Sequence, residues 1–334
     1  MTPKELQQQL KRIAQARLQL SIMIWGPPGI GKSSIVQQVG DELKLPVIDL
    51  RLSQLAPTDL RGLPVAREGH SEWYPPEFLP RMGEGILFLD EFNMAVPAMQ
   101  GIAQQLILDR KVGNYILPEG WLIWAAGNPR GQRVSTHEMP GPLANRFVHW
   151  TVEADLDSFR THALDQGLPE ELLAFLAFRP RLLHQFDSKQ NAWPSPRSWV
   201  MASQLWQLGL DPAGAVGDGP AGEFKSFLKV YRLLPDLERI LAGQAIEKGF
   251  PGDPGSRFAI CTGLACRVGS VEQALRAMDW LVREAPAEWV QLFVSDLFPT
   301  LRRKQLFEAV SKALVQEVGF RRFIGQYRKL LEAA

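Results

Sequence analysis

The sequence predicts an α/β protein in which a parallel five-stranded sheet, covered by helices, is followed by a region made of helices alone. Three observations predict this class. Five short apolar runs alternate with helical patterns in the first part of the chain, which is typical of a parallel sheet covered on both faces. A glycine-rich turn separates the first apolar run from the helix after it. Beyond residue 154 the strand patterns stop and amphipathic helix patterns continue.

The chain begins with a predicted helix over residues 3–18. Thr2 and Glu5 have the spacing of a capping box, and Pro3 occupies the first helical position, where its missing N–H is not needed. Leu6, Leu10 and Ile13 follow at helical spacing.

Five apolar runs predict the strands of the sheet. Each run is short and ends in glycine, proline or polar residues, as buried strands do. The predicted strands are Ser21–Trp25, Leu45–Leu52, Ile86–Leu89, Trp121–Ala126 and Phe147–Val152. Helical patterns separate most of them, most clearly over Val96–Asp109.

The second half of the chain is predicted to be helical. The clearest helical patterns are Leu156–Gln166, Pro169–Phe178, Ser198–Leu208, Phe224–Leu234, Val271–Arg283 and Lys304–Val315. Asp211–Gly222 is rich in Gly, Pro and Ala and is predicted to be a linker. The chain should therefore divide into an α/β core (residues 1–153), a small helical lid (154–210) and an extra C-terminal helical domain (223–334). We expect this last domain to dock a client or partner.

Composition limits the classes of function. The 334 residues exceed one ordinary core, and 46% hydrophobic with 22% charged residues is typical of a soluble globular protein. A net charge of +1 argues against a dedicated nucleic-acid binder. Cys261 and Cys266 fit neither a disulfide framework nor a zinc motif and are expected in the core. Without a signal pattern or a membrane-spanning run, a cytoplasmic location is expected.

One motif indicates phosphate binding. Gly26–Ser33 fits the pattern G-x-x-x-x-G-K-[ST] and lies between a predicted strand and a predicted helix. Glycines let backbone amides surround phosphate oxygens, and the helix aims its N-terminal dipole at them. Lys32 would reach the β- and γ-phosphates, and Ser33 would hold Mg²⁺. The predicted nucleotide-binding residues are Gly26, Pro27, Pro28, Gly29, Ile30, Gly31, Lys32, Ser33 and Ser34.

Two acids end the third predicted strand. Asp90 and Glu91 follow four apolar residues, and a carboxylate at such a strand end holds the Mg²⁺ shell in other P-loop ATPases. We expect Asp90, with Ser33, to bind the metal and Glu91 to orient and polarise the attacking water.

Three further polar residues are candidates on weaker local grounds. Asn128 follows the fourth strand and could bond the γ-phosphate or the water, although Asn before Pro is also a common turn. Arg146 precedes the fifth strand, and Arg197 lies in the first turn of a helix after Ser195 and Pro196. Taken alone, an arginine at either of these positions is most often an ordinary surface residue.

The order of these motifs resembles the AAA+ ATPases, and specifically their MoxR-like branch. The resemblance covers roughly residues 20–210 and includes Ala56–Pro64, which is similar to the family's segment after the second strand. It implies that Asn128 is sensor 1, that Arg146 is an arginine finger acting on a neighbouring subunit, and that Arg197 is sensor 2. Asn145 stands where family members often have Asp.

Some assignments stay open within this resemblance. Arg130 and Arg133 lie on the loop after Asn128 and are alternatives to Arg146 as the finger. Val65–Pro75 and Lys111–Trp121 look like hairpins, which either pack on their own domain or, as in the MoxR-like branch, face a ring's channel or partners.

The resemblance implies an ATP hydrolase that uses ATP with Mg²⁺, forms a homohexamer and remodels or activates a client protein. A partner with a von Willebrand factor A domain is typical of that branch. The alternatives are a nucleic-acid motor or loader of the same superfamily and an assembly scaffold gated by ATP. Metal-chelatase motor subunits share the core, so the motifs do not name a client.

Overall fold

The computed structural model describes residues 1–129, 136–187, 189–246 and 249–316. The chain forms two compact units. The first contains residues 1–158 with short stretches at 186–189 and 195–197, and the second contains residues 159–185, 190–194 and the chain from 198 onward. Each unit has its own core and is described by itself.

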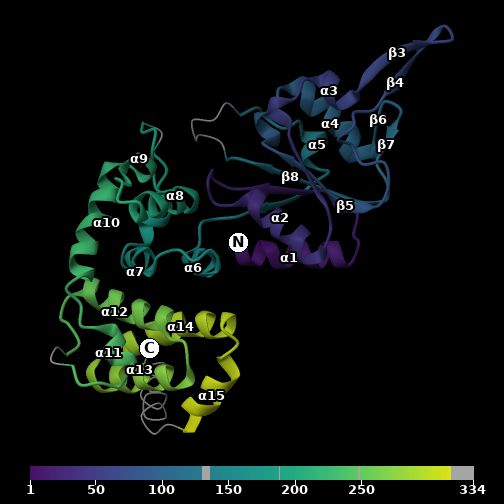
Figure 1. Ribbon diagram of the computed structural model, residues 1–334. Helices are drawn as coiled ribbons and strands as arrows, with labels where there is room; N and C mark the ends of the chain where they lie inside the picture. Colours follow the sequence, from purple (N-terminus) through teal and green to yellow (C-terminus); the bar gives the residue numbers. More distant parts are fainter. Residues whose placement is uncertain (130–135, 188, 247–248, 317–334) are drawn as a thin grey trace. The chain divides into compact units, whose positions relative to one another are not determined.

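The first unit is built on a five-stranded parallel sheet, as predicted (Figure 1). Its strand order is β2 (Val47–Arg51), β5 (Glu84–Asp90), β8 (Gly120–Gly127), β1 (Ile22–Trp25) and β9 (Val148–Thr151). Every neighbouring pair runs parallel. The carboxyl ends of all five strands therefore meet at one edge, which is where open α/β sheets bind ligands.

Helices cover both faces of this sheet. On one face lie α1 (Pro3–Gln15) and α2 (Lys32–Leu43), and on the other lie α3 (Pro57–Arg61), α4 (Pro97–Asp109) and the short α5 (Gly141–Ala144) (Figure 1). Alternate residues of the strands supply the two cores, because successive side chains point to opposite faces. Ile24 and Trp124 pack with α1 and α2, whereas Met23 and Ile123 pack with α4.

The first helix is capped as predicted but ends early. The Thr2 hydroxyl accepts from the Glu5 N–H, and the Glu5 carboxylate accepts from the Thr2 N–H. The helix ends at Gln15 rather than at residue 18, because Arg17 adopts a left-handed backbone with φ 52°. Leu18 beyond it is exposed and offers no packing that would extend the helix.

Both predicted hairpins form. The first pairs β3 (Leu63–Arg67) with β4 (His70–Tyr74), and the second pairs β6 (Lys111–Val112) with β7 (Tyr115–Ile116). The β3–β4 hairpin extends away from the sheet, and all of β3 is exposed (Figure 1). In the β6–β7 hairpin Val112 and Tyr115 are buried in the core of their own unit.

The second unit is helical throughout the residues that the structure describes. Its elements are α6 (Leu156–Asp165), α7 (Glu170–Phe178), the 3₁₀ turn η3 (Pro180–Leu183), α8 (Pro196–Gln207), α9 (Ala213–Val216), α10 (Asp218–Tyr231), α11 (Leu237–Leu241), α12 (Pro254–Arg267), α13 (Val271–Glu284), α14 (Ala287–Arg303) and α15 (Phe307–Gln316). The first turns of α6 and α8 are grouped with the first unit.

The predicted linker is wrong, because residues 211–222 are largely helical. They form α9 and the first turns of α10. Gly217 takes φ 88° at the start of α10, and Pro220 lies in the first turn of that helix, where a missing N–H costs no hydrogen bond. Phe224 of α10 is fully buried and packs on Phe175 of α7 and Trp199 of α8. Helices predicted for the lid and for the C-terminal domain therefore share one compact unit.

Two smaller features of the helical unit also bear on the predictions. Lys304 ends α14, and α15 begins only at Phe307, so the helix predicted from Lys304 starts three residues later. Cys261 lies in the core as predicted, and burial raises the pKa of its thiol; burial also raises the pKa of Cys266 to about 12.

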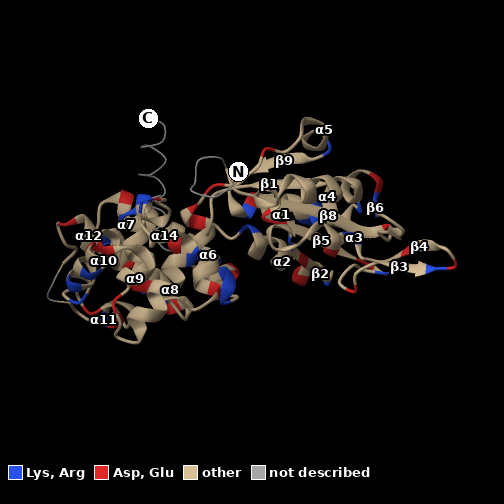
Figure 2. Cartoon of the chain, turned by 90° about the horizontal axis from the view of Figure 1, so that it is seen from above, with Lys and Arg blue, Asp and Glu red and all other residues tan. Residues whose placement is uncertain are grey.

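Basic and acidic residues alternate along the ribbon of each unit (Figure 2). No helix in the described part of the chain is both long and apolar enough to cross a membrane.

Candidate functional site

The glycine-rich turn lies between β1 and α2, as predicted. Gly29 and Gly31 adopt φ 83° and φ 97°, a backbone conformation that L side chains adopt only with strain. Gly26 is confined as well, because a Cβ there would lie 2.8 Å from the Val152 carbonyl oxygen. Ile30 packs into the core under the turn, Pro27 and Pro28 are half-buried within it, and Ser34 is exposed on the first turn of α2.

Lys32 is buried at the start of α2. Its ammonium donates to the carbonyl oxygens of Gly26 (2.6 Å) and Pro27 (3.1 Å) and to Asn128 Oδ1 (2.9 Å). Burial lowers the pKa of Lys32 to about 8; Asp90 and Glu91 oppose this shift, and Arg197 adds to it. Three acceptors of its own chain thus hold the lysine in the turn.

Asp90 lies beside the helix that carries Ser33. The Ser33 hydroxyl donates to Asp90 Oδ2 at 2.6 Å, and the Glu91 backbone N–H donates to Asp90 Oδ1 at 2.8 Å. The predicted metal-binding pair is therefore in direct contact, and both groups offer the oxygen ligands that Mg²⁺ prefers.

Glu91 follows β5 with a left-handed backbone, φ 54° and ψ 33°. Its Oε2 accepts a hydrogen bond from the Ser53 hydroxyl. Ser53 belongs to the 3₁₀ turn η1 (Leu52–Gln54), which follows the neighbouring strand β2. Sequence reasoning missed Ser53; the signal that could have found it is its place at the end of a strand predicted to lie in the same sheet.

Asn128 is reached by a second residue that the sequence did not single out. Asn93, in the 3₁₀ turn η2 (Phe92–Met94), is only 3% exposed. Its amide donates to the Asn128 carbonyl oxygen (2.8 Å) and accepts from the Asn128 N–H (3.1 Å). This reciprocal pair fixes the backbone of Asn128, whose side chain is then free to face Lys32.

The first turn of α8 rests on the P-loop. The Arg197 N–H donates to the Gly29 carbonyl oxygen at 3.2 Å, and a Cβ on Gly29 would lie 2.7 Å from the Ser195 Oγ. Ser195 is buried, whereas the Arg197 side chain is exposed beside the turn. The predicted sensor 2 residue is therefore next to the nucleotide-binding loop of its own chain.

Arg146 lies apart from this cluster. It is exposed in the turn between α5 and β9, where its N–H donates to the Leu143 carbonyl oxygen at 3.0 Å. Among the described residues its guanidinium has neither a hydrogen bond nor an ion pair. Arg130 and Arg133, the alternatives to it, lie outside the described residues.

The arrangement fits a nucleoside triphosphate with Mg²⁺. A loop with two left-handed glycines, placed at a helix N-terminus, presents backbone amides to phosphate oxygens. The lysine supplies a cation inside that loop, and the Ser33–Asp90 pair supplies hard oxygen ligands. Asn128 follows β8, the strand beside β1, and Glu91 follows β5, the next strand in the sheet.

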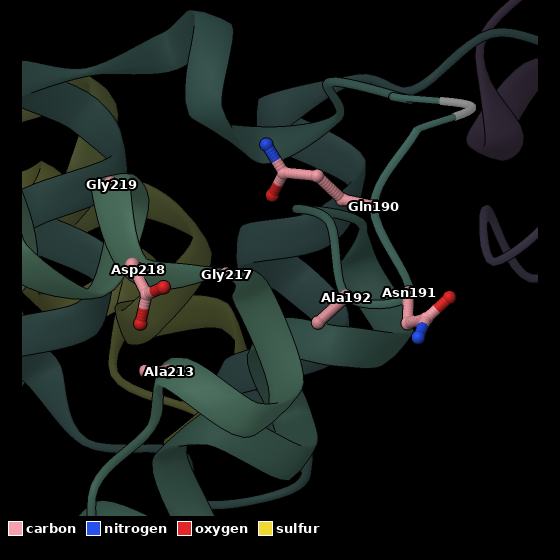
Figure 3. A pocket seen from close by; sticks show the side chains of 7 residues that line it. All are labelled: Gln190, Asn191, Ala192, Ala213, Gly217, Asp218 and Gly219. Carbon is pink, nitrogen blue, oxygen red and sulfur yellow. The ribbon is translucent and has the colours of Figure 1, made fainter.

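Two cavities among the described residues lie elsewhere. One of about 370 Å³ opens in the helical unit between Gln190–Ala192 and the start of α10, where Asp218 and Gly219 line it (Figure 3). Another of about 180 Å³ is lined in part by Leu164, Cys266 and Arg303. Neither contains a predicted site residue.

The sheet order and the site define the first unit as an AAA+ P-loop fold. Within the chain, residues 21–147 match the family model of the AAA domain, dynein-related subfamily. Midasin from Giardia intestinalis is 29% identical to this chain over 154 residues, a match that covers 42% of this chain and 3% of Midasin. The chain therefore spans a small fraction of that relative.

Solved structures give more distant likenesses. The RuvB Holliday junction branch migration motor from Thermotoga maritima has a TM-score of 0.41 and 16% identity over 72% of this chain and 74% of its own. NtrX from Brucella abortus in complex with ATP has a TM-score of 0.44 and 15% identity over 91% of this chain and 68% of its own. Likenesses this distant carry no conclusion about what this chain binds or does.

Proposed function

We propose that this protein is a Mg²⁺-dependent ATP hydrolase of the MoxR-like type that works as a homohexamer and remodels or activates a client protein. The observation that carries the ATPase assignment is the contact between Ser33 and Asp90 beside a buried Lys32, with Glu91 adjoining them. A purely structural turn would need neither the buried ammonium nor the paired metal ligands.

Each residue has a separate task in this proposal. Lys32 and the amides of residues 26–33 bind the phosphates, while Ser33 and Asp90 hold Mg²⁺. Glu91 takes a proton from the attacking water at its carboxylate, and Asn128 orients that water through its side-chain amide. Bound Mg-ATP supplies the bond that is cleaved and the cation that neutralises charge on the phosphates.

Two arginines complete the proposal. Arg197 reports nucleotide to the helices that follow it, because its backbone contacts Gly29 of the loop. Arg146 serves the ATP of the next subunit, which is the reason for proposing a ring. An exposed guanidinium that contacts no acid among the described residues supports that role.

Paired variants test the ATPase assignment. Lys32→Ala should abolish tight binding of Mg-ATP, whereas Glu91→Gln should keep binding and lose turnover, because Glu91 acts only on the water. Binding is measured with a fluorescent ATP analogue and turnover by phosphate release. Wild-type turnover in Glu91→Gln would contradict the assignment.

The client proposal has its own test. Glu91→Gln, loaded with Mg-ATP, should hold the assembly on its client during capture from native lysate, with Lys32→Ala as the control that cannot load. A client, and with it a partner carrying a von Willebrand factor A domain, should be enriched only on Glu91→Gln. Light scattering with and without ATP checks the hexamer.

A further inference from the structure

His149 of β9 joins two segments that the proposed mechanism uses separately. Trp25 Nε1 donates to His149 Nδ1 at 2.9 Å, and His149 Nε2 donates to the Ala144 carbonyl oxygen at 2.8 Å. An indole N–H can only donate and a carbonyl can only accept, so the ring is the neutral tautomer with its proton on Nε2. Both nitrogens are therefore used.

The two hydrogen-bond partners of His149 lie next to two different parts of the proposed mechanism. Trp25 is the last residue of β1, directly before Gly26 of the P-loop. Ala144 is the last residue of α5, two residues before Arg146. The imidazole thus connects the strand that ends in the subunit's own nucleotide loop to the turn that carries the exposed arginine.

Ring contacts extend the link. The His149 ring lies nearly coplanar with that of Trp25, with centroids 6.1 Å apart and planes 9° apart, as the hydrogen bond between their ring nitrogens requires. Phe147 meets His149 edge-on at 6.2 Å and Phe92 edge-on at 5.7 Å. Phe92 directly follows Glu91, and Phe147 directly follows Arg146. One row of rings therefore runs from the residue after Glu91, through Phe147 and His149, to Trp25 at the end of β1.

Backbone hydrogen bonds hold the turn around Arg146 from within: the Arg146 N–H donates to the Leu143 carbonyl oxygen (3.0 Å) and the Phe147 N–H to the Ala144 carbonyl oxygen (3.1 Å). The helix α5 has four residues, too short to be stable on its own. Asn145 and Arg146 are exposed, and buried Leu143 and Phe147 anchor the two sides of the turn. The bond from His149 to the last carbonyl of α5 adds to these a side-chain contact, which ties the end of α5 to β9 two residues before Arg146.

We infer that His149 is a positioning residue for Arg146: it holds the α5–β9 turn through Ala144 and, through Trp25, ties this arginine to the P-loop strand of its own subunit. The inference rests on the proposed function, because it takes Arg146 as the group that completes a neighbour's site. A ring built this way couples the nucleotide loop of each subunit to the arginine that the subunit offers to the next.

His149→Phe is the direct test, because phenylalanine keeps an aromatic ring at this position and removes both hydrogen bonds. Displacing a catalytic group by about 1 Å can cost about 10²-fold, so turnover should fall by about 10-fold to 100-fold. The KM for ATP should change less than about twofold, since P-loop residues 26–33 are untouched.

His149→Gln keeps a donor for Ala144 and should recover most of the lost turnover. Thr151→Val, at an exposed position of the same strand, is the matched control and should match the wild type.

A dilution experiment asks where the defect acts. Two series of mixtures are compared: His149→Phe subunits with increasing amounts of Glu91→Gln subunits, and wild-type subunits with the same amounts of Glu91→Gln. The ratios are chosen so that the wild-type mixtures still hydrolyse ATP. In rings dominated by Glu91→Gln, most intact Glu91 sites receive the arginine of a Glu91→Gln neighbour, whose His149 is intact. Turnover per intact Glu91 in the His149→Phe mixtures should therefore approach the value in the wild-type mixtures. Persistence of the full defect at high dilution would overturn the inference, because His149 would then act within its own site.

Arg146→Ala separates this inference from the proposed function. If Arg146→Ala keeps full turnover, the finger assignment fails and the inference fails with it. If Arg146→Ala loses turnover while His149→Phe does not, the inference alone fails. A raised KM in His149→Phe, or an equal loss in His149→Gln and His149→Phe, would likewise overturn it.

Discussion

Lys32 and Arg146 lie near opposite ends of two neighbouring parallel strands, Lys32 beyond the carboxyl end of β1 and Arg146 before the amino end of β9, and the structure surrounds these two cations in opposite ways. Lys32 is 9% exposed and donates to three acceptors of its own chain. Arg146 is exposed, and its guanidinium has no partner among the described residues. The lysine is prepared for a ligand that its own subunit binds, because its position is set in advance. The arginine is left available for a group from outside the chain.

Arg146→Ala should give the largest effect and could break this comparison. Arginine fingers supply roughly 10³ to 10⁵ in rate, because a guanidinium fork stabilises charge on the transferring phosphoryl oxygens. Turnover should fall by that factor while the dissociation constant for Mg-ATP stays within a few-fold of wild type. Steady-state phosphate release and nucleotide binding are the measurements. A lost affinity for Mg-ATP with normal turnover would mean that Arg146, like Lys32, serves to bind nucleotide.

Phe224→Ala should lower the free energy of unfolding without changing the surroundings of Lys32 and Arg146. Truncating a buried phenylalanine costs about 3–5 kcal/mol, and Phe224 is the ring on which Phe175 and Trp199 meet. Denaturant unfolding followed by circular dichroism should show the loss. Lys225→Ala, at an exposed site next to it, should lower the free energy of unfolding by less than about 1 kcal/mol. Unchanged stability in Phe224→Ala would contradict the merged helical core.

Asn93→Ala tests whether the fixed surroundings of Lys32 matter for turnover. It removes both hydrogen bonds to the Asn128 backbone, so the amide facing Lys32 loses its fixed position. A shift of about 1 Å can cost on the order of 10²-fold in turnover. Asn93→Asp keeps the acceptor for the Asn128 N–H and should lose less. Phosphate release checks both variants, and equal losses would mean that the donor half of the pair decides.

Ser53→Ala should give the smallest change. The Ser53 hydroxyl holds the Glu91 carboxylate, and a hydrogen bond to a charged group contributes about 1.5–3 kcal/mol at most. Freed from it, Glu91 should turn more readily toward water, and basal turnover should rise by a few-fold. Gln54→Ala, in the same 3₁₀ turn and exposed, is the control. A drop in turnover would show that Ser53 supports the working orientation of Glu91.

Sequence reasoning found the parts of the site that are local in the chain. The P-loop and the acids after β5 are contiguous motifs at the ends of predicted strands, and the ends of parallel strands meet at one edge. Asn93 and Ser53 were missed because their roles depend on partners that are distant in sequence: Asn93 is 35 residues from Asn128, and Ser53 is 38 from Glu91. No local pattern distinguishes either from an ordinary turn residue.

The linker error has a different physical origin. Gly, Pro and Ala over residues 211–222 predicted flexible chain from composition, but position decides what each residue does. Gly217 supplies a left-handed start to α10, Pro220 falls where no helix hydrogen bond is lost, and Ala221 is buried. The burial of Ala221 and Phe224 could be seen only once α7, α8 and α10 were packed together.

The left-handed backbone of Glu91 has a consequence for how this protein has been selected. A non-glycine residue at φ 54° costs on the order of 1 kcal/mol or more, and glycine or asparagine would relieve that strain. Glu91→Gly should therefore make the fold more stable and leave it unable to activate water. The chain keeps the less stable residue at the point where the proposed chemistry needs a carboxylate. This is the trade between stability and activity that natural proteins make at their working sites.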